Sequence, residues 1–173
     1  MSLFEGGQFV AGENIRPGVV VALDRNNDFR VITARTSLLG TGNTNIPDKQ
    51  HALLIVGVAP TWSRRPNDFA NADFAAVTGE LLPVYRNGQI ALVRVHTNVG
   101  VTRGDPLIVA EHHDPTNINA GCVRPLSWND GAPNFRRYVI IGYALHSAPA
   151  GGANVHNYVR VLLDIKMVEN KET

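Results

Sequence analysis

The chain has 173 residues, of which 44% are hydrophobic, and its 16 basic and 15 acidic residues leave a formal net charge of +1. This size and composition allow one substantial hydrophobic core and argue against a chain that is disordered as a whole. The near-neutral charge argues against a nucleic-acid partner, because neutralising many phosphates requires a strongly basic surface.

Cysteine content and apolar run length limit the classes further. The one cysteine, Cys122, can form no intrachain disulfide, and we expect it to be a buried small hydrophobic residue. No apolar stretch reaches the roughly 18 residues of a membrane helix, and the first ten residues lack the basic start and apolar run of a secretory signal. The sequence therefore predicts a protein made in a cytoplasm, without a membrane partner.

Short runs rich in Val, Ile and Leu, separated by Gly, Pro, Asn and Asp, dominate the chain, and no segment keeps the period of an amphipathic helix. The sequence predicts an all-β fold: a single compact antiparallel β-barrel or sandwich with long loops. We expect an extended N-terminal arm over residues 1–12, the barrel over 13–166 and a charged C-terminal tail over 167–173. The predicted strands are 19–23, 29–34, 53–59, 75–83, 89–96, 106–110, 122–125, 138–144 and 155–165.

Turn residues punctuate these strands. Residues 24–28 and 86–89 place Asn, Asp and Gly where tight hairpin turns need a positive φ, so both predict antiparallel pairing of the strands beside them. Residues 37–50, 60–74 and 111–120 have few regular apolar positions, so we expect long loops there.

The two halves of the chain share short sequence motifs. Residues 15–22 resemble residues 101–110, because each segment runs from an apolar residue through a turn to a short hydrophobic strand that ends in alanine. Residues 54–59 resemble residues 139–144, and both contain Gly-x-Ala inside an apolar run. The halves are therefore predicted to be pseudo-symmetric parts of one barrel or sandwich.

A third repeated motif is Val-Arg-Val, at residues 93–95 and 159–161, although its spacing differs between the halves. The glycines inside the second motif, Gly57 and Gly142, lack a side chain to pack. A glycine in a strand indicates a bulge, a barrel corner or a close approach of another backbone.

Catalytic and cofactor motifs are weak in this chain. His112-His113-Asp114 has the residue types of a metal site, but adjacent strand side chains point to opposite faces, so a solvated loop is favoured. No nucleophile-elbow or phosphate-binding glycine motif is present. The sequence therefore predicts no catalytic residue, no metal and no cofactor.

Aromatic residues beside arginines give the candidate contact surface. Trp62, Arg64, Arg65 and Phe69 lie in the predicted loop 60–74 and have the composition of an interface core. The alternative is that this loop packs on its own barrel. In the predicted arm, Phe4 and Phe9 are separated by glycines and are candidates for contact with a neighbouring subunit.

The order of five motifs resembles one protein family. The motifs are Ala11-Gly-Glu-Asn-Ile-Arg-Pro-Gly18, Ile55-Val-Gly-Val-Ala59, Val99-Gly-Val-Thr-Arg-Gly-Asp-Pro106, Ile141-Gly-Tyr-Ala144 and Tyr158-Val-Arg-Val-Leu-Leu163. In this order the chain resembles the capsid decoration (cement) proteins of tailed bacteriophages, from about residue 11 to residue 164. The segments 37–50 and 60–74 are longer than in the shorter members of that family, which leaves the contact surface open.

The resemblance implies a β-barrel that forms a homotrimer on the outer surface of the phage head. There it would bridge neighbouring subunits of the major capsid protein after the shell expands, without catalysis. The implied partners are the major capsid protein and further copies of this chain. The implied location is the capsid surface of the virion, which assembles in the bacterial host cytoplasm.

Two other functions are open at this point. A receptor- or carbohydrate-binding module of a tail fibre or baseplate would share the strand content, and Trp62 and Trp128 lie in predicted loops where a sugar could stack. A trimeric hydrolase of the dUTPase kind is less well supported. Tyr85-Arg86-Asn87-Gly88 only weakly resembles the Tyr-Arg-Gly-like segment of such enzymes, and the last six residues lack the glycines of their C-terminal arm.

Overall fold

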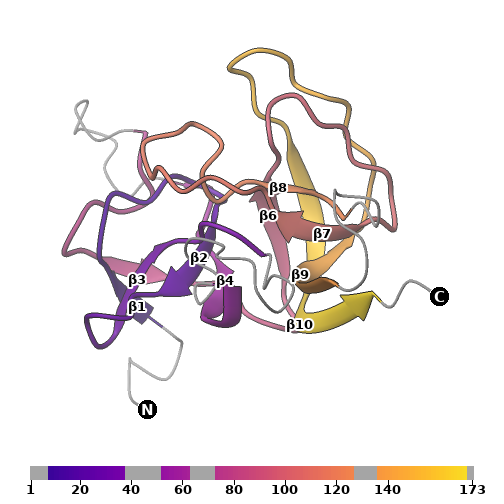
Figure 1. Cartoon of the computed structure of the whole chain (residues 1–173). Helices are drawn as coiled ribbons and strands as arrows, with labels where there is room; N and C mark the ends of the chain where they lie inside the picture. The colour runs from indigo at the N-terminus through magenta and orange to yellow at the C-terminus, as the bar shows by residue number, and fades with distance from the viewer. Residues whose placement is uncertain (1–7, 38–51, 63–72, 127–135, 171–173) are drawn as a thin grey trace.

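The computed structural model describes residues 8–37, 52–62, 73–126 and 136–170, and the account below concerns these residues. They form ten β-strands in two five-stranded sheets, which confirms the all-β prediction (Figure 1). Within the described ranges, no helix is long and apolar enough to cross a membrane.

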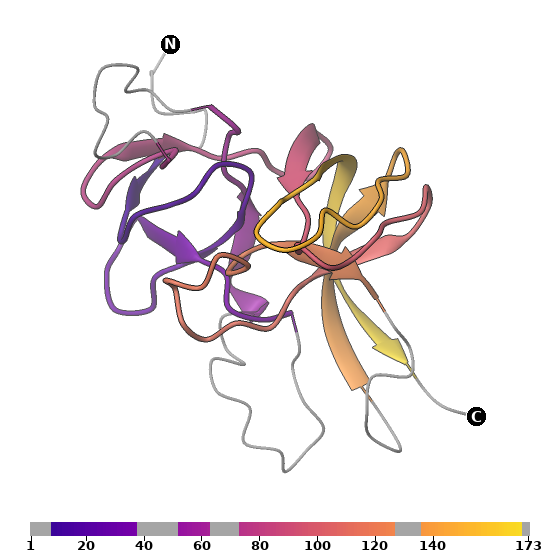
Figure 2. The ribbon, with the colours of Figure 1, turned by 90° about the horizontal axis from the view of Figure 1, so that it is seen from above.

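Each half of the chain builds one sheet. The first sheet has the order β4-β2-β3-β1-β5, with β1 Gln8–Ala11, β2 Val20–Leu23, β3 Arg30–Thr33, β4 Ile55–Val58 and β5 Leu81–Pro83. The second has the order β6-β10-β9-β7-β8, with β6 Ile90–Arg94, β7 Pro106–Val109, β8 Val123–Pro125, β9 Arg136–Ala144 and β10 Tyr158–Asn170. Seen from above, the two sheets stand side by side as two lobes (Figure 2).

Isolated bridges join the edges of each sheet. Val58 and Tyr85 exchange two backbone hydrogen bonds, of 3.0 and 2.9 Å, which link β4 to the end of β5. A parallel bridge between Val95 and Val123 links the end of β6 to β8. Each half therefore curls until one isolated bridge joins its two edge strands, and we call each curled sheet a barrel.

The two barrels have the same topology. If the strands of each half are numbered one to five, the orders are 4-2-3-1-5 and 1-5-4-2-3, which become the same circular order once the bridges close them. In both halves the first and third strands run parallel, and every other neighbouring pair is antiparallel. The repeat seen in the sequence therefore corresponds to a duplicated barrel.

The register agrees with this duplication. Ile15 and Val101, the first residues of the repeated segments, each form an antiparallel bridge with a later alanine, Ala76 or Ala148. Gly57 lies opposite the second residue of β2, and its counterpart in the second half lies opposite the second residue of β7. Equivalent residues therefore occupy equivalent places in the two barrels.

Two strand glycines sit where another backbone crosses closely. A Cβ atom on Gly57 would lie 1.9 Å from the carbonyl oxygen of Tyr85, and one on Gly142 would lie 2.1 Å from that of Leu162. Real Cβ atoms do not approach a backbone this closely. The close backbone approach predicted for these glycines is thus present in both halves.

Strand β2 is buried on both faces and joins the two cores. Val19 and Val21 belong to the cluster inside the first barrel. Val20 and Ala22, on the other face, belong to a larger cluster that contains Leu107 and other interior residues of the second barrel. The outer face of the first barrel therefore packs against the core of the second.

Two element boundaries differ from the sequence predictions. Strand β1 lies inside the predicted N-terminal arm, where Phe9 pairs with Leu82 of β5 and Ala11 is fully buried. Strand β10 extends to Asn170, into the predicted charged tail, because β9 provides a pairing partner along its length. Both segments gain their hydrogen bonds from strands that are distant in the sequence.

Two other predictions are corrected within the sheets. The predicted strand 75–83 is reduced to Leu81–Pro83, because a turn closed by the amide of Glu80 and the carbonyl of Val77 (3.0 Å) precedes it. The two Val-Arg-Val motifs are not equivalent, since Val93 in β6 pairs directly with Val159 in β10. The hairpin predicted at residues 24–28 is confirmed, because β2 and β3 pair antiparallel around it.

Substituting the strand glycines tests the close backbone approach. We expect Gly57→Ala and Gly142→Ala each to lower the free energy of unfolding by about 3 kcal/mol or more, because the methyl group forces two strands apart. Urea unfolding at equilibrium measures this. Gly100→Ala is the matched control, since its Cβ would have no neighbour closer than 3.5 Å. Equal stability of all three variants would contradict the close approach.

Candidate binding surface

The turn at residues 86–89 connects the first barrel to the second. The predicted turn forms: the amide of Gln89 donates to the carbonyl of Arg86 (3.1 Å), and the amide of Arg86 donates to Oε1 of Gln89 (2.7 Å). Gly88 takes a φ of 84°, which glycine adopts at little cost. The predicted hairpin pairing is wrong, because β5 and β6 belong to different sheets.

Asn87 explains why the turn does not close a hairpin. Its Oδ1 accepts a hydrogen bond from the amide of Ile165 (2.7 Å), and its Nδ2 donates to the carbonyl of the same residue (3.3 Å). These contacts fall at the register shift of β10 between Leu163 and Lys166. A bulge leaves backbone groups without ladder partners. The side chain of Asn87 satisfies them and thereby fixes the turn to the second barrel.

Two hollows flank this turn. One, of about 540 Å³, is lined by Trp62 and Tyr85. The other, of about 430 Å³, is lined by Phe9. Arg86 and Asn87 line both hollows. We call these five residues the aromatic surface.

Two aromatic side chains of the aromatic surface are partly exposed to solvent. Trp62 is 45% exposed and Tyr85 is 37% exposed, which is high for large aromatic side chains. The guanidinium carbon of Arg86 lies 5.3 Å from the centroid of the Phe9 ring, so a cation–π contact orients this cation at the rim of the hollows. Tryptophan, tyrosine and arginine are the residues most enriched at binding hot spots.

Two of the sequence-predicted contact residues meet at this surface. Phe9 and Trp62 are distant in the sequence, and they line two hollows that share Arg86 and Asn87. Phe4, Arg64, Arg65 and Phe69 lie outside the described residues.

Tyr85 and Arg86 were not among the predicted contacts. The sequence places them in the hydrolase-like motif 85–88, and their nearness to Trp62 comes from the bridge between β4 and the end of β5. In that motif the side chain of Asn87 is already bonded to the backbone of Ile165. If the alternation of inward and outward side chains along β5 is continued beyond Pro83, Tyr85 falls on the outward face.

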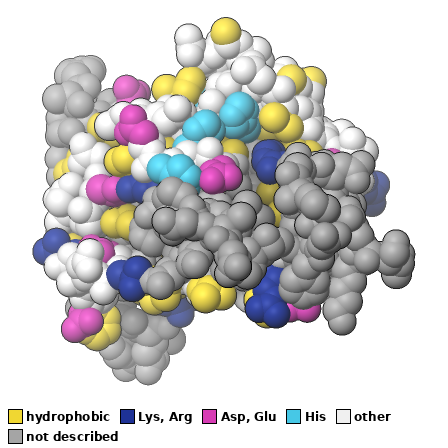
Figure 3. Space-filling view, viewed as in Figure 1, with side chains coloured by type: hydrophobic (Ala, Val, Ile, Leu, Met, Phe, Trp, Pro, Cys, Tyr) yellow, Lys and Arg dark blue, Asp and Glu magenta, His cyan; other side chains and the backbone are white. Residues whose placement is uncertain are grey.

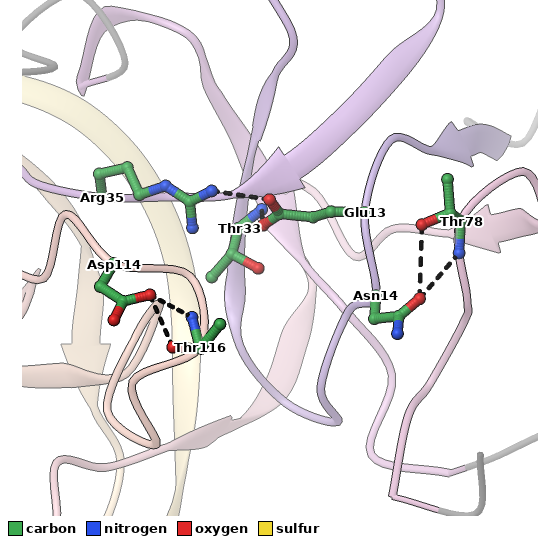
Figure 4. A network of polar contacts seen from close by, with 7 residues as sticks. All are labelled: Glu13, Asn14, Thr33, Arg35, Thr78, Asp114 and Thr116. Atoms are coloured by element: carbon green, nitrogen blue, oxygen red, sulfur yellow. Dashed lines mark hydrogen bonds and ion pairs between the residues drawn. The ribbon is translucent and has the colours of Figure 1, made fainter. Parts of the chain in front are cut away.

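Polar contacts hold the loop after β7 against the first barrel, and Figure 4 shows the ion pair of Glu13 and Arg35 with Asp114 and Thr116 of that loop nearby. Glu13 pairs with the almost buried Arg35 (2.7 Å), and the carbonyl of Arg35 accepts a hydrogen bond from the amide of His112 (3.0 Å). Arg16 donates to the carbonyl of Asn117 (2.7 Å). Together with the hydrogen bond from the amide of Val20 to the carbonyl of Gly121 (2.9 Å), these contacts fix the relative position of the barrels.

Histidine side chains gather on one face of the molecule, with acidic and basic side chains beside them (Figure 3). The rings of His96 and His112 stack with centroids 5.4 Å apart and planes 21° apart. Burial lowers the pKa of His96, and the positive charges of His112 and Arg124 lower it further. Burial also lowers the pKa of His112, with a further contribution from His113 that Glu111 opposes.

A third histidine of this face lies beside the cysteine. His156 Nδ1 is 2.9 Å from the carbonyl oxygen of Val95 and 3.7 Å from Cys122 Sγ. Burial lowers the pKa of His156, although the hydrogen bond to Val95 acts in the opposite direction. Burial raises the pKa of Cys122 to about 12. The prediction that Cys122 is a buried hydrophobic residue is confirmed.

The metal-like sequence 112–114 does not converge on one point. His113 Nε2 lies 3.0 Å from Glu111 Oε1, whereas the His112 ring stacks on another histidine. Asp114 Oδ1 accepts hydrogen bonds from the amide and hydroxyl of Thr116. Among the residues that the structure describes, no group of three His, Cys, Asp or Glu side chains could hold a metal ion.

The lowered histidine pKa values predict a loss of stability in mild acid. Because folded His96, His112 and His156 titrate below the ordinary 6.5, the unfolded chain binds protons first as pH falls. The free energy of unfolding is therefore highest above pH 6.5, and it falls as the pH drops toward the pKa values of these histidines in the folded state. Urea midpoints at about pH 7.5 and about pH 5.5 measure this. His96→Gln should reduce the difference, and an unchanged difference in this variant would contradict the assignment.

A scan against protein-family models finds none that matches this chain, and a search of curated proteins finds no match. No family assignment follows from these comparisons. The case for a function rests on the order of the sequence motifs and on the surfaces that the fold exposes.

Proposed function

We propose that this protein is a structural virion protein that binds the outer surface of a tailed-phage head. It stabilises the expanded capsid by bridging subunits of the major capsid protein. It acts as a homotrimer at the capsid surface, without catalysis and without a cofactor. The order of the five sequence motifs and the aromatic surface support this proposal.

The observation that carries the proposal is the pair of exposed aromatic side chains, Trp62 and Tyr85, in one hollow beside Arg86. Large aromatic side chains gain most when a partner removes them from water, and an oriented cation adds specificity for a carboxylate or a carbonyl group. Phe9 and Trp62 are contact candidates from the sequence alone, and they flank the same turn.

Bridging several capsid subunits raises the overall affinity of a surface that binds each subunit only weakly. Once one subunit of a trimer is bound, the other contacts become intramolecular, which raises avidity by about 10² to 10⁴. A protein that binds only the expanded lattice stabilises that lattice by mass action. The shell would then resist the pressure of the packaged genome without any chemical reaction.

Binding to expanded, undecorated phage heads tests the proposal. We expect the protein to sediment with heads at a fixed number of copies that is divisible by three, and Trp62→Ala to bind at least about tenfold more weakly, as for a hot-spot residue. Phe29→Ala is the matched control, because Phe29 is 81% exposed at the tip of the β2–β3 hairpin. Absence of co-sedimentation of the folded wild type would remove the proposal, and wild-type binding by Trp62→Ala would remove only this contact.

The N-terminal segment gives a second test. Residues 2–7 precede β1, so their deletion leaves every described strand intact. We expect the shortened protein to bind heads more weakly, because Phe4 is a candidate contact, and urea unfolding checks that it folds. Unchanged head binding would show that the segment makes no contact with the capsid.

A carbohydrate-binding module of a tail fibre or baseplate is the second candidate. The observation in its favour is that the hollow beside Trp62 and Tyr85 also contains the amide side chains of Asn87 and Gln89. Sugars stack on aromatic faces and bind polar groups at their edges. A glycan array would test it: a sugar bound by the wild type and lost in Trp62→Ala, together with absence of head binding, would favour this function.

A further inference from the structure

The outer face of the second barrel carries a group of outward side chains on three adjacent strands. Strands β6, β10 and β9 are neighbours, and their pairing places these side chains in two rows. One row contains Leu92, Arg160 and Leu145, and the other contains Ile90, Leu162 and Tyr143. We call these six residues the leucine face.

The exposure of the leucine face is unusual for a sheet. Ile90 is 56% exposed, Leu162 42%, Leu92 39% and Leu145 38%. The residues between them along the strands, such as Ala91 and Val161, are buried in the barrel. An antiparallel sheet with one face in water ordinarily alternates apolar and polar residues. Apolar residues on both faces, grouped as they are here, indicate that a partner covers the outer face.

Two basic side chains lie at this face. Lys166 Nζ lies 5.3 Å from the centroid of the Tyr143 ring and pairs with Asp164. Arg160 is exposed between Leu92 and Leu145, and among the described residues it takes part in no ion pair. None of the six residues of the face is acidic. An arginine within an apolar patch binds a carboxylate strongly, because the apolar surroundings exclude water from the ion pair.

We propose that the leucine face docks on a protein surface that is apolar and places a carboxylate opposite Arg160. This inference rests on the proposed function and assigns that chemistry to the capsid protein. In the chain the face begins next to the aromatic surface, since Gln89 lines the hollow beside Trp62 and directly precedes Ile90.

The same face of a second copy of this chain is a less suitable occupant. If two leucine faces packed on each other, two unpaired Arg160 side chains would be buried in one apolar contact. Burying like charges together is strongly unfavourable. A partner with a carboxylate removes this cost and gains an ion pair.

Charge reversal and polar substitution test the leucine face. We expect Arg160→Glu and Leu162→Ser each to lower the affinity for expanded heads at least about tenfold. The matched controls are Arg103→Glu, at an exposed turn before β7, and Leu53→Ser, whose side chain is 64% exposed. In addition, raising the salt concentration should weaken wild-type binding more than binding of Arg160→Gln, because the variant lacks the ion pair. Urea midpoints check that all variants fold.

The outcomes separate this inference from the proposed function. If the wild type binds heads and the Arg160 and Leu162 variants bind equally well, the leucine face is not the contact while the proposed function stands. If the wild type does not bind heads, both proposals fail. If sedimentation shows that the Leu162 variant dissociates an oligomer of the wild type, the face is a contact between copies and the carboxylate partner is wrong. Selective loss in the two face variants, with both controls intact, supports the inference.

Discussion

Strand β2 belongs to two hydrophobic cores at once, and the arrangement of the two barrels depends on this. Val19 and Val21 fill the first barrel, while Val20 and Ala22 face the second. A shift of one residue would exchange the two sets, so the register of β2 fixes how the barrels meet. It also explains a continuous apolar run where a sheet with one wet face would show alternation.

The candidate surface follows from the same constraint. Strand β4 pairs with β2, and its last residue, Val58, holds Tyr85 through two backbone hydrogen bonds. Gly57 makes this approach possible, because any side chain there would meet the carbonyl of Tyr85. The chain then turns at Arg86 toward the second barrel, so Trp62 after β4 and Tyr85 after β5 emerge at one hollow.

The sequence predicted features that depend on local pattern and missed those that depend on distant partners. The strands, the Asp24 turn and the crossing glycines could be predicted, since each has a local signature. Strand β1 could not, because four residues around Phe9 become a strand only through pairing with β3 and β5. At the site, Phe9 and Trp62 were predicted from residue type, whereas Arg86 joins them through a tertiary contact.

The contact between the barrels is heterologous: the outer face of one unit meets the open core of the next. Repeated without limit, such a contact would build an open-ended filament. In the second barrel the positions equivalent to Ala22 and Val58 are Ile108 and Tyr143, and they pack in a cluster with Leu126. In the second unit these equivalent positions are thus used for contacts within the unit itself, in place of a contact with another barrel.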